Sequence, residues 1–280
     1  MPVISVYQHG GTSGTPPTRN DHMRAKRDEV SGWSSKTARS NTRFLQSVKL
    51  DSLSGVGVAF TLTLKNCPEN ADDWHKLRRA FSMRLQRAGM SRLHWVTEWQ
   101  RRGVPHLHGV AYFPPDRSPE AYCNLILGHW LQIAERYVCA IWGQNAKPIT
   151  NSLGWLQYLA KHASRGAGHY QRSSESIPDG WKKKTGRMWG KWGEWDTGDP
   201  SKFEVNMTAF HAYRRRFRAY RISEARSSCD WRSLKYARRC LKSNLASLSR
   251  VRGTSGWIPE EAHMAMVHWL AAAGYTVESV

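Results

Sequence analysis

The stretch 103–113, GVPHLHGVAYF, carries two histidines separated by one leucine inside an otherwise apolar run. Its Val, Tyr and Phe residues predict a strand, and residues two apart in a strand point to the same face. His106 and His108 therefore project together, while Leu107 points to the other side. The preceding stretch 91–100, SRLHWVTEWQ, alternates in the same way and joins it through a short loop, so we expect a β-hairpin.

Three side chains of this hairpin are expected on one face. Glu98 precedes His106 by an even number of residues, so a turn centred on Arg102 places the carboxylate opposite or diagonal to the imidazoles. This set suits a divalent cation with open positions for water or a phosphate oxygen. We expect Mg²⁺ or Mn²⁺, with imidazole nitrogen favouring Mn²⁺ and heavier ions. The alternative is a chance HxH pair beside a solvated glutamate.

Further elements flank the hairpin. Residues 56–65 alternate as a strand, and the patterns of 71–90 and 118–137 predict amphipathic helices. A strand within 141–150 and a helix over 150–166 follow. The order strand, helix, hairpin, helix, strand, helix predicts an α+β fold, in which an antiparallel sheet with the hairpin at its centre packs against helices.

Composition divides the chain into three parts. Residues 1–50 are rich in Gly, Ser, Thr, Pro and basic residues and lack a hydrophobic period, so we expect a flexible basic N-terminal arm. The α+β domain is expected over 51–200, where its C-terminal part contains loops around one short strand. Residues 201–280 are basic and helical in pattern, which predicts a helical C-terminal extension.

The charge balance indicates a polyanionic partner. The chain has 42 Lys and Arg against 22 Asp and Glu, a net charge of +20, and nucleic acid is the simplest partner for such an excess. A merely basic surface or a histone-like packaging protein is the alternative. Five cysteines without a CxxC pair favour neither disulfides nor a zinc site. The sequence lacks a P-loop, a signal peptide and a membrane-spanning run, so we expect a cytoplasmic protein without ATP-driven helicase activity or a membrane partner.

A helical wheel separates two faces of the segment 150–166. The apolar arc consists of Leu153, Leu156, Leu159, Ala160 and Ala163. Tyr158, Lys161 and His162 lie on the opposite side, about one turn apart. A phenol, with a pKa of about 10, is a weak nucleophile unless a cation or base assists it, and Lys161 could stabilise the phenolate or hold a phosphate. The alternative is a helix whose solvated face happens to include these residues.

Taken together, these motifs resemble those of a known superfamily. FTLTL at 60–64, Glu98 with HLH at 106–108, and YLAK at 158–161 occur in the order of the three motifs of HUH endonucleases. More narrowly, they resemble the rolling-circle replication initiator (Rep) proteins of bacterial plasmids and of single-stranded DNA phages, including filamentous phages. The resemblance covers residues 56–195 and includes GRMWGKWG, which is similar to the short closing strand of phage initiators.

The resemblance implies a metal-dependent DNA endonuclease and strand transferase. His106, His108 and Glu98 would bind the metal, Tyr158 would be the nucleophile and Lys161 its electrostatic partner. The enzyme would nick single-stranded DNA at a replication origin, leaving a 5′-phosphotyrosine link and a free 3′-OH for a host polymerase working with a host helicase. It would later rejoin the ends to terminate replication.

One position departs from some phage initiators. Where those proteins have a second tyrosine four residues after the first, this chain has His162, for which only an auxiliary role is implied. The resemblance then implies a cycle with a single tyrosine. A second subunit, water or another tyrosine such as Tyr170 would complete the second strand transfer.

Basic residues are expected to bind the DNA. The candidates are Arg101 and Arg102 in the hairpin loop, Lys182, Lys183, Lys184, Arg187 and Lys191 among tryptophans, and Arg214, Arg215, Arg216, Arg218 and Arg221 in the extension. Trp181, Trp189, Trp192 and Trp195 either stack on bases or pack the sheet. Rival hypotheses are a conjugative relaxase, an HUH transposase and a non-catalytic DNA-binding protein; relaxases usually place their tyrosine before the histidines.

Overall fold

The structure is a computed structural model that describes residues 1–15, 32–164, 171–182, 184–241 and 253–280, without the side chains of 35, 161–164 and 174. Within these ranges the chain forms seven α-helices and two antiparallel five-stranded sheets, which confirms the α+β class. The residues group into two compact units. The hairpin unit contains 32–45 and the described residues from 49 to 196, and the terminal unit contains 1–15, 46–48 and the described residues from 197 onward.

The predicted hairpin lies at the centre of the hairpin unit's sheet. The strand order is β6-β3-β5-β4-β7, and every neighbouring pair is antiparallel. The bounds are β3 Val56–Leu62, β4 Arg92–Trp99, β5 Pro105–Phe113, β6 Asn145–Pro148 and β7 Trp189–Gly193. All nine residues of β5 are buried. The sheet therefore holds its central strand in a fixed register.

A glycine in the HLHG sequence allows close packing across this sheet. A Cβ on Gly109 would lie 2.3 Å from the Phe60 ring and 2.8 Å from the main-chain oxygen of His94. Phe60 sits opposite Gly109 in the register of β3 and β5. Because Gly109 has no side chain, the Phe60 ring can pack against this position of β5.

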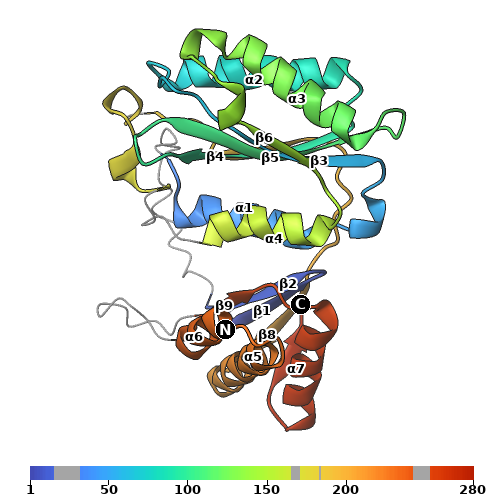
Figure 1. Cartoon of the computed structure of the whole chain (residues 1–280). Coiled ribbons are helices and arrows are strands. Elements are labelled where there is room, and N and C mark those ends of the chain that lie inside the picture. The colour runs from blue at the N-terminus through green and yellow to red at the C-terminus, as the bar shows by residue number, and fades with distance from the viewer. Residues whose placement is uncertain (16–31, 165–170, 183, 242–252) are drawn as a thin grey trace. The chain divides into compact units, whose positions relative to one another are not determined.

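Helices cover both faces of the sheet (Figure 1). Helices α2 Ala71–Arg87 and α3 Pro119–Ile133 lie on one face, and α1 Ser35–Ser47 and α4 Ser152–Ser164 lie on the other. Asn70 and Ser118 accept hydrogen bonds from the first turns of α2 and α3, as expected for N-cap residues. The strand predicted within 141–150 is β6, Asn145–Pro148, and the residues before it, Ile141–Gly143, form a 3-10 turn.

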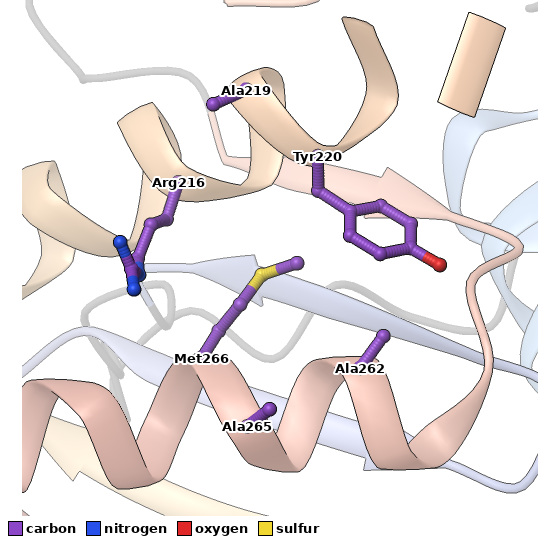
Figure 2. Close-up of a pocket in the computed structure, with 6 residues that line it drawn as sticks. All are labelled: Arg216, Ala219, Tyr220, Ala262, Ala265 and Met266. Carbon is purple, nitrogen blue, oxygen red and sulfur yellow. The ribbon is translucent and has the colours of Figure 1, made fainter. Parts of the chain in front are cut away.

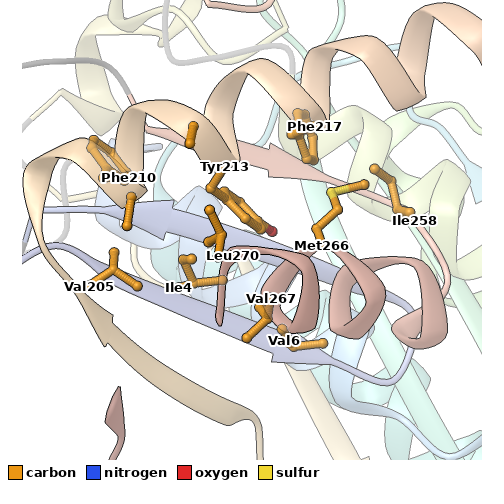
Figure 3. Packing of buried hydrophobic residues seen from close by; sticks show 12 residues of the cluster. Ile4, Val6, Val205, Phe210, Tyr213, Phe217, Ile258, Met266, Val267 and Leu270 are labelled. Atoms are coloured by element: carbon orange, nitrogen blue, oxygen red, sulfur yellow. The ribbon is translucent and has the colours of Figure 1, made fainter. Parts of the chain in front are cut away.

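The terminal unit contains a second sheet that the sequence patterns did not indicate. Its strand order is β10-β8-β1-β2-β9. The bounds are β1 Val3–Tyr7, β2 Gly10–Gly14, β8 Ser201–Val205, β9 Thr254–Gly256 and β10 Val277–Ser279, with helices α5 Met207–Ser227, α6 Trp231–Arg239 and α7 Glu260–Ala272. Ile4 and Val6 of β1 are buried in an apolar cluster with residues of α5 and α7 such as Phe210 and Val267 (Figure 3).

The prediction of a flexible arm over residues 1–50 is therefore wrong for β1, β2 and α1. The apolar residues of β1 alternate over only five positions, and the average composition of the first fifty residues conceals them. β1 also pairs with β8, about two hundred residues later in the chain. Local patterns do not reveal such a distant partner. No helix in the described ranges has the length and apolar character needed to cross a bilayer.

Candidate metal centre

The hairpin brings three candidate ligands together. Glu98 faces His106 directly in the register of β4 and β5, and their side chains and that of His108 are buried. One ligand atom from each residue lies within 4.8 Å of the others. The Nε2 atom of His108 is 3.2 Å from His106 Nε2 and 3.6 Å from Glu98 Oε2. The even spacing noted in the sequence thus corresponds to a compact triad.

Thr61 from the neighbouring strand orients one imidazole. It faces His108 in the register of β3 and β5, and its Oγ1 lies 2.8 Å from His108 Nδ1. A neutral His108 that donates its Nδ1 hydrogen to Thr61 directs its Nε2 lone pair toward His106 and Glu98, where a shared cation would bind. The FTLTL motif therefore contributes a residue that supports the triad.

A buried arginine, which the sequence analysis missed, holds the carboxylate. Arg172 donates from Nε and Nη2 to Glu98 Oε1, at 2.9 and 2.6 Å. Its guanidinium also lies 4.0 Å from the ring centroid of Trp33, whose Nε1 donates to the main-chain oxygen of Thr97 at 2.9 Å. Neither Arg172 nor Trp33 belongs to a motif, and only the tertiary fold brings them to β4.

The donor set fits a divalent cation. Two imidazole nitrogens and one carboxylate oxygen are compatible with Mn²⁺, Mg²⁺ and first-row transition metals, and three protein ligands leave positions for further oxygen ligands. The triad is buried, so its carboxylate needs compensating positive charge, of which Arg172 supplies part. Glu98, His106 and His108 would hold the ion.

Tyr158 lies beside the triad. Its ring centroid is 6.2 Å from that of His108, in an edge-on arrangement, and 5.1 Å from that of Trp155. The side chain is 37% exposed, whereas Leu156 and Leu159 on the opposite face of α4 are buried. The helix thus presents the phenol at the surface near the imidazoles. The side chains of Lys161 and His162, and all of Tyr170, lie outside the described residues.

The predicted DNA contacts of the hairpin unit have varied environments. Arg102 donates to the main-chain oxygens of Leu64 and Lys65, so it fastens the hairpin loop to the chain that follows β3. Salt bridges join Lys182 to Asp179 and Lys184 to Asp72, and the Lys191 ammonium lies 4.6 Å from the ring centroid of Phe44. Arg101 and Arg187 are exposed, and Lys183 lies outside the described residues.

The tryptophans among these basic residues divide into two groups. Trp181 and Trp195 are buried and belong to the core, as the packing alternative predicts for part of the set. Trp189 is half-buried and stacks with Phe44, while Trp192 is 40% exposed. Of the four, only Trp192 is therefore exposed enough to offer much of its ring to a base.

The remaining predicted contacts lie on α5 in the terminal unit. Arg215 and Arg218 are exposed, Arg214 and Arg221 donate to main-chain oxygens, and Arg216 lies 3.8 Å from the ring centroid of Trp269. A hollow of about 280 Å³ between α5 and α7 is lined by Arg216, Ala219, Tyr220, Ala262, Ala265 and Met266 (Figure 2). It contains neither a carboxylate nor an imidazole, so it does not resemble a second metal centre.

Comparison with known proteins identifies the family. A protein of Pseudomonas phage Pf3 named "Replication-associated protein G2P" is 41% identical over 279 residues, which cover 98% of this chain and 99% of that protein. The family model described as replication-associated protein ORF2/G2P matches residues 57–167, a span that contains the triad and Tyr158. This chain belongs to the ORF2/G2P family. The resemblance to replication initiators found in the motifs is thereby confirmed.

Other relatives of this ORF2/G2P protein come from bacteria. Two proteins of Xylella fastidiosa, each named "Putative replication protein", are 46% identical over 286 residues in strain 9a5c and 45% identical over 264 residues in strain Temecula1. The alignments cover 100% and 92% of this chain and 100% and 99% of the relatives. No solved structure matches the chain.

Proposed function

We propose that this ORF2/G2P protein initiates replication by nicking single-stranded origin DNA through a tyrosine transesterification. The observation that carries the proposal is the position of the Tyr158 ring, 6.2 Å from that of His108 in the metal-ligand triad. A nucleophile and a cation site must both reach one phosphodiester for this chemistry. The names of the relatives supply the replication context.

In the proposed reaction, Tyr158 Oη attacks the scissile phosphorus in line with the O3′–P bond. The new O–P bond leaves the 5′ phosphate on the tyrosine, the O3′–P bond breaks, and the departing oxygen takes up a proton to become a free 3′-OH. The phenolic proton leaves to solvent or to a neighbouring base. A divalent ion in the triad would polarise the scissile phosphate and stabilise the negative charge that develops on its oxygens.

The covalent intermediate allows the ends to be rejoined. Because a phosphodiester is exchanged for a phosphotyrosyl ester, attack by a 3′-OH on that ester restores the DNA and frees Tyr158 without ATP. A host polymerase would extend the 3′-OH in the meantime, and a host helicase would separate the strands. The net charge of +20 supports binding to the DNA backbone.

The reaction is tested by trapping the covalent intermediate. Labelled single-stranded DNA from the origin region of the replicon is incubated with the protein and Mn²⁺, and adducts that survive denaturation are mapped by mass spectrometry. We expect the phosphodiester on Tyr158 and its loss in Tyr158→Phe. Tyr236→Phe, which changes an exposed tyrosine of α6, serves as the matched control and should react normally. DNA binding without any adduct would favour a non-catalytic DNA-binding protein.

A further inference from the structure

An exposed apolar loop lies between α3 and β6. Val138, Ile141 and Trp142 are 51%, 53% and 89% exposed. Trp142 is the most exposed large hydrophobic residue in the part of the chain that the structure describes. Such a group of apolar side chains on the surface is typical of a binding site.

The loop is held firmly although its side chains are exposed. Gln144 accepts from the main-chain nitrogen of Thr63 at 2.7 Å and donates to the main-chain oxygen of Ala140 at 2.9 Å. Thr63 Oγ1 donates to the main-chain oxygen of Gly143 at 3.0 Å. Val138 has a φ of +55°, a left-handed conformation that is unfavourable for a β-branched residue. The surrounding structure compensates this strain, as it often does at functional sites.

Strand register places the loop at the triad's end of the sheet. Asn145 begins β6 directly after the loop and faces Thr61, and Thr61 in turn faces His108. Two strand spacings separate Asn145 from His108, a distance of about 10 Å between their backbones. Trp142 is three residues before Asn145. The exposed Trp142 therefore belongs to a loop at the end of the sheet that carries the candidate metal centre.

Cationic and aromatic side chains connect this edge to the candidate nucleophile. The Lys147 ammonium lies 4.9 Å from the ring centroid of Trp155. The Trp155 ring in turn lies 5.1 Å from that of Tyr158. A surface that combines positive charge with aromatic rings suits a single nucleic-acid strand, because it can contact both phosphates and bases.

We propose that Trp142, supported by Ile141, is a stacking platform for an unpaired base of the DNA strand that enters the candidate site. The proposal rests on the proposed function and extends it, because it locates a substrate contact on the β6 edge. A protein partner would also suit an apolar loop. The net charge of +20 and the Lys147, Trp155 and Tyr158 series favour single-stranded DNA as the occupant.

Photo-cross-linking tests the platform without requiring cleavage. The probe is an oligo(dT) strand in which thymines are replaced by 5-iodouracil, a base that cross-links to stacked aromatic side chains under ultraviolet light. The full-length protein is irradiated with this probe in EDTA, and tandem mass spectrometry assigns the linked residues. We expect a cross-link to Trp142 and a roughly tenfold lower affinity for oligo(dT) in Trp142→Ala, within the range found for single stacking residues.

Two further variants make the result specific. Trp231→Ala removes another highly exposed tryptophan, on α6. This variant should bind oligo(dT) more than fivefold more tightly than Trp142→Ala does. Trp142→Phe retains an aromatic face and should restore most of the affinity. The proposal is overturned if the bound probe does not cross-link to Trp142, or if the affinities of Trp142→Ala and wild type are equal. It is also overturned if Trp142→Ala dissociates an oligomer in light scattering while its total yield of cross-linked probe equals that of the wild type.

The outcome is independent of the proposed chemistry. Because the assay contains no metal and no scission step, a missing covalent adduct in the trapping experiment does not alter the cross-linking result. Conversely, a protein that forms the Tyr158 adduct but binds no base at Trp142 would retain the proposed function and lose only the platform.

Discussion

Arg172 donates two hydrogen bonds to a single oxygen of Glu98, Oε1, from Nε at 2.9 Å and Nη2 at 2.6 Å. Both side chains are buried, and the other carboxylate oxygen, Oε2, lies 3.6 Å from His108 Nε2. The guanidinium thereby fixes the rotation of the carboxylate and compensates its charge. One oxygen is committed to Arg172 while the other faces the imidazoles.

Removing Arg172 is expected to make the thermal stability of the protein depend on a cation at the candidate site. Truncating one partner of a buried ion pair costs about 3–5 kcal/mol, so Arg172→Gln should unfold at a lower temperature in EDTA. A bound cation would then be the main counter-charge of Glu98, so Mn²⁺ should raise the Tm more in the variant than in wild type. Arg172→Lys, which keeps the charge, should fall between them. Equal Mn²⁺ shifts in all three proteins would contradict this role.

Replacing His106 should separate catalysis from DNA affinity. His106→Ala removes one of the three proposed ligands and should reduce Mn²⁺ binding and abolish adduct formation. Affinity for single-stranded DNA should remain largely intact, because we expect it to depend on many basic residues. His129→Ala on α3 is the control and should react as wild type. A large loss of DNA affinity in His106→Ala would show that the triad itself binds the strand.

A buried histidine on the same strand predicts instability in acid. His94 is fully buried, its Nε2 is 2.8 Å from Asn41 Oδ1, and burial, assisted by Lys191, lowers its pKa to about 3. Because the unfolded state binds the proton more readily, the stability contributed by neutral His94 is lost as the pH falls from about 6.5 toward 3. The loss approaches about 1.4 kcal/mol per pH unit for one proton.

Urea unfolding between pH 7 and 4.5 measures this dependence. His94→Gln keeps an amide donor for Asn41 but cannot titrate, so its stability should decline less steeply with falling pH. His268→Gln changes an exposed histidine and should retain the wild-type slope. His263, whose pKa is lowered by burial to about 4, should leave a residual slope in both variants. Identical slopes for wild type and His94→Gln would rule His94 out as the source.

Gly109→Ala tests the packing of the hairpin. The added methyl would overlap the Phe60 ring, so the variant should lose about 1–3 kcal/mol of unfolding free energy. Gly128→Ala is the matched control, because Gly128 lies within α3 with no atom within 4 Å of an added Cβ, and it should gain up to about 1 kcal/mol. Chemical denaturation of both variants and the wild type measures these changes in unfolding free energy. A stable Gly109→Ala protein would mean that Phe60 can move aside.

Local patterns predicted most of the hairpin unit. The strands β3, β4 and β5 and the helices α2, α3 and α4 lie where alternation and helical spacing placed them, because each buries one regular face of its own sequence. The same reasoning failed for β1 and β2. These two strands are short, and they pair with β8 and β9 from the other end of the chain, which local patterns do not reveal.

The sequence by itself determined that His106 and His108 share a face and that Glu98 can join them, because side chains alternate along strands and a short loop fixes the register. It also placed Tyr158 opposite the apolar face of its helix. Only the tertiary structure decided that Arg172 binds the Glu98 carboxylate and packs on Trp33, and that the loop of Trp142 lies at the same end of the sheet. These contacts join residues far apart in the chain, and packing between elements, not periodicity within them, creates such contacts.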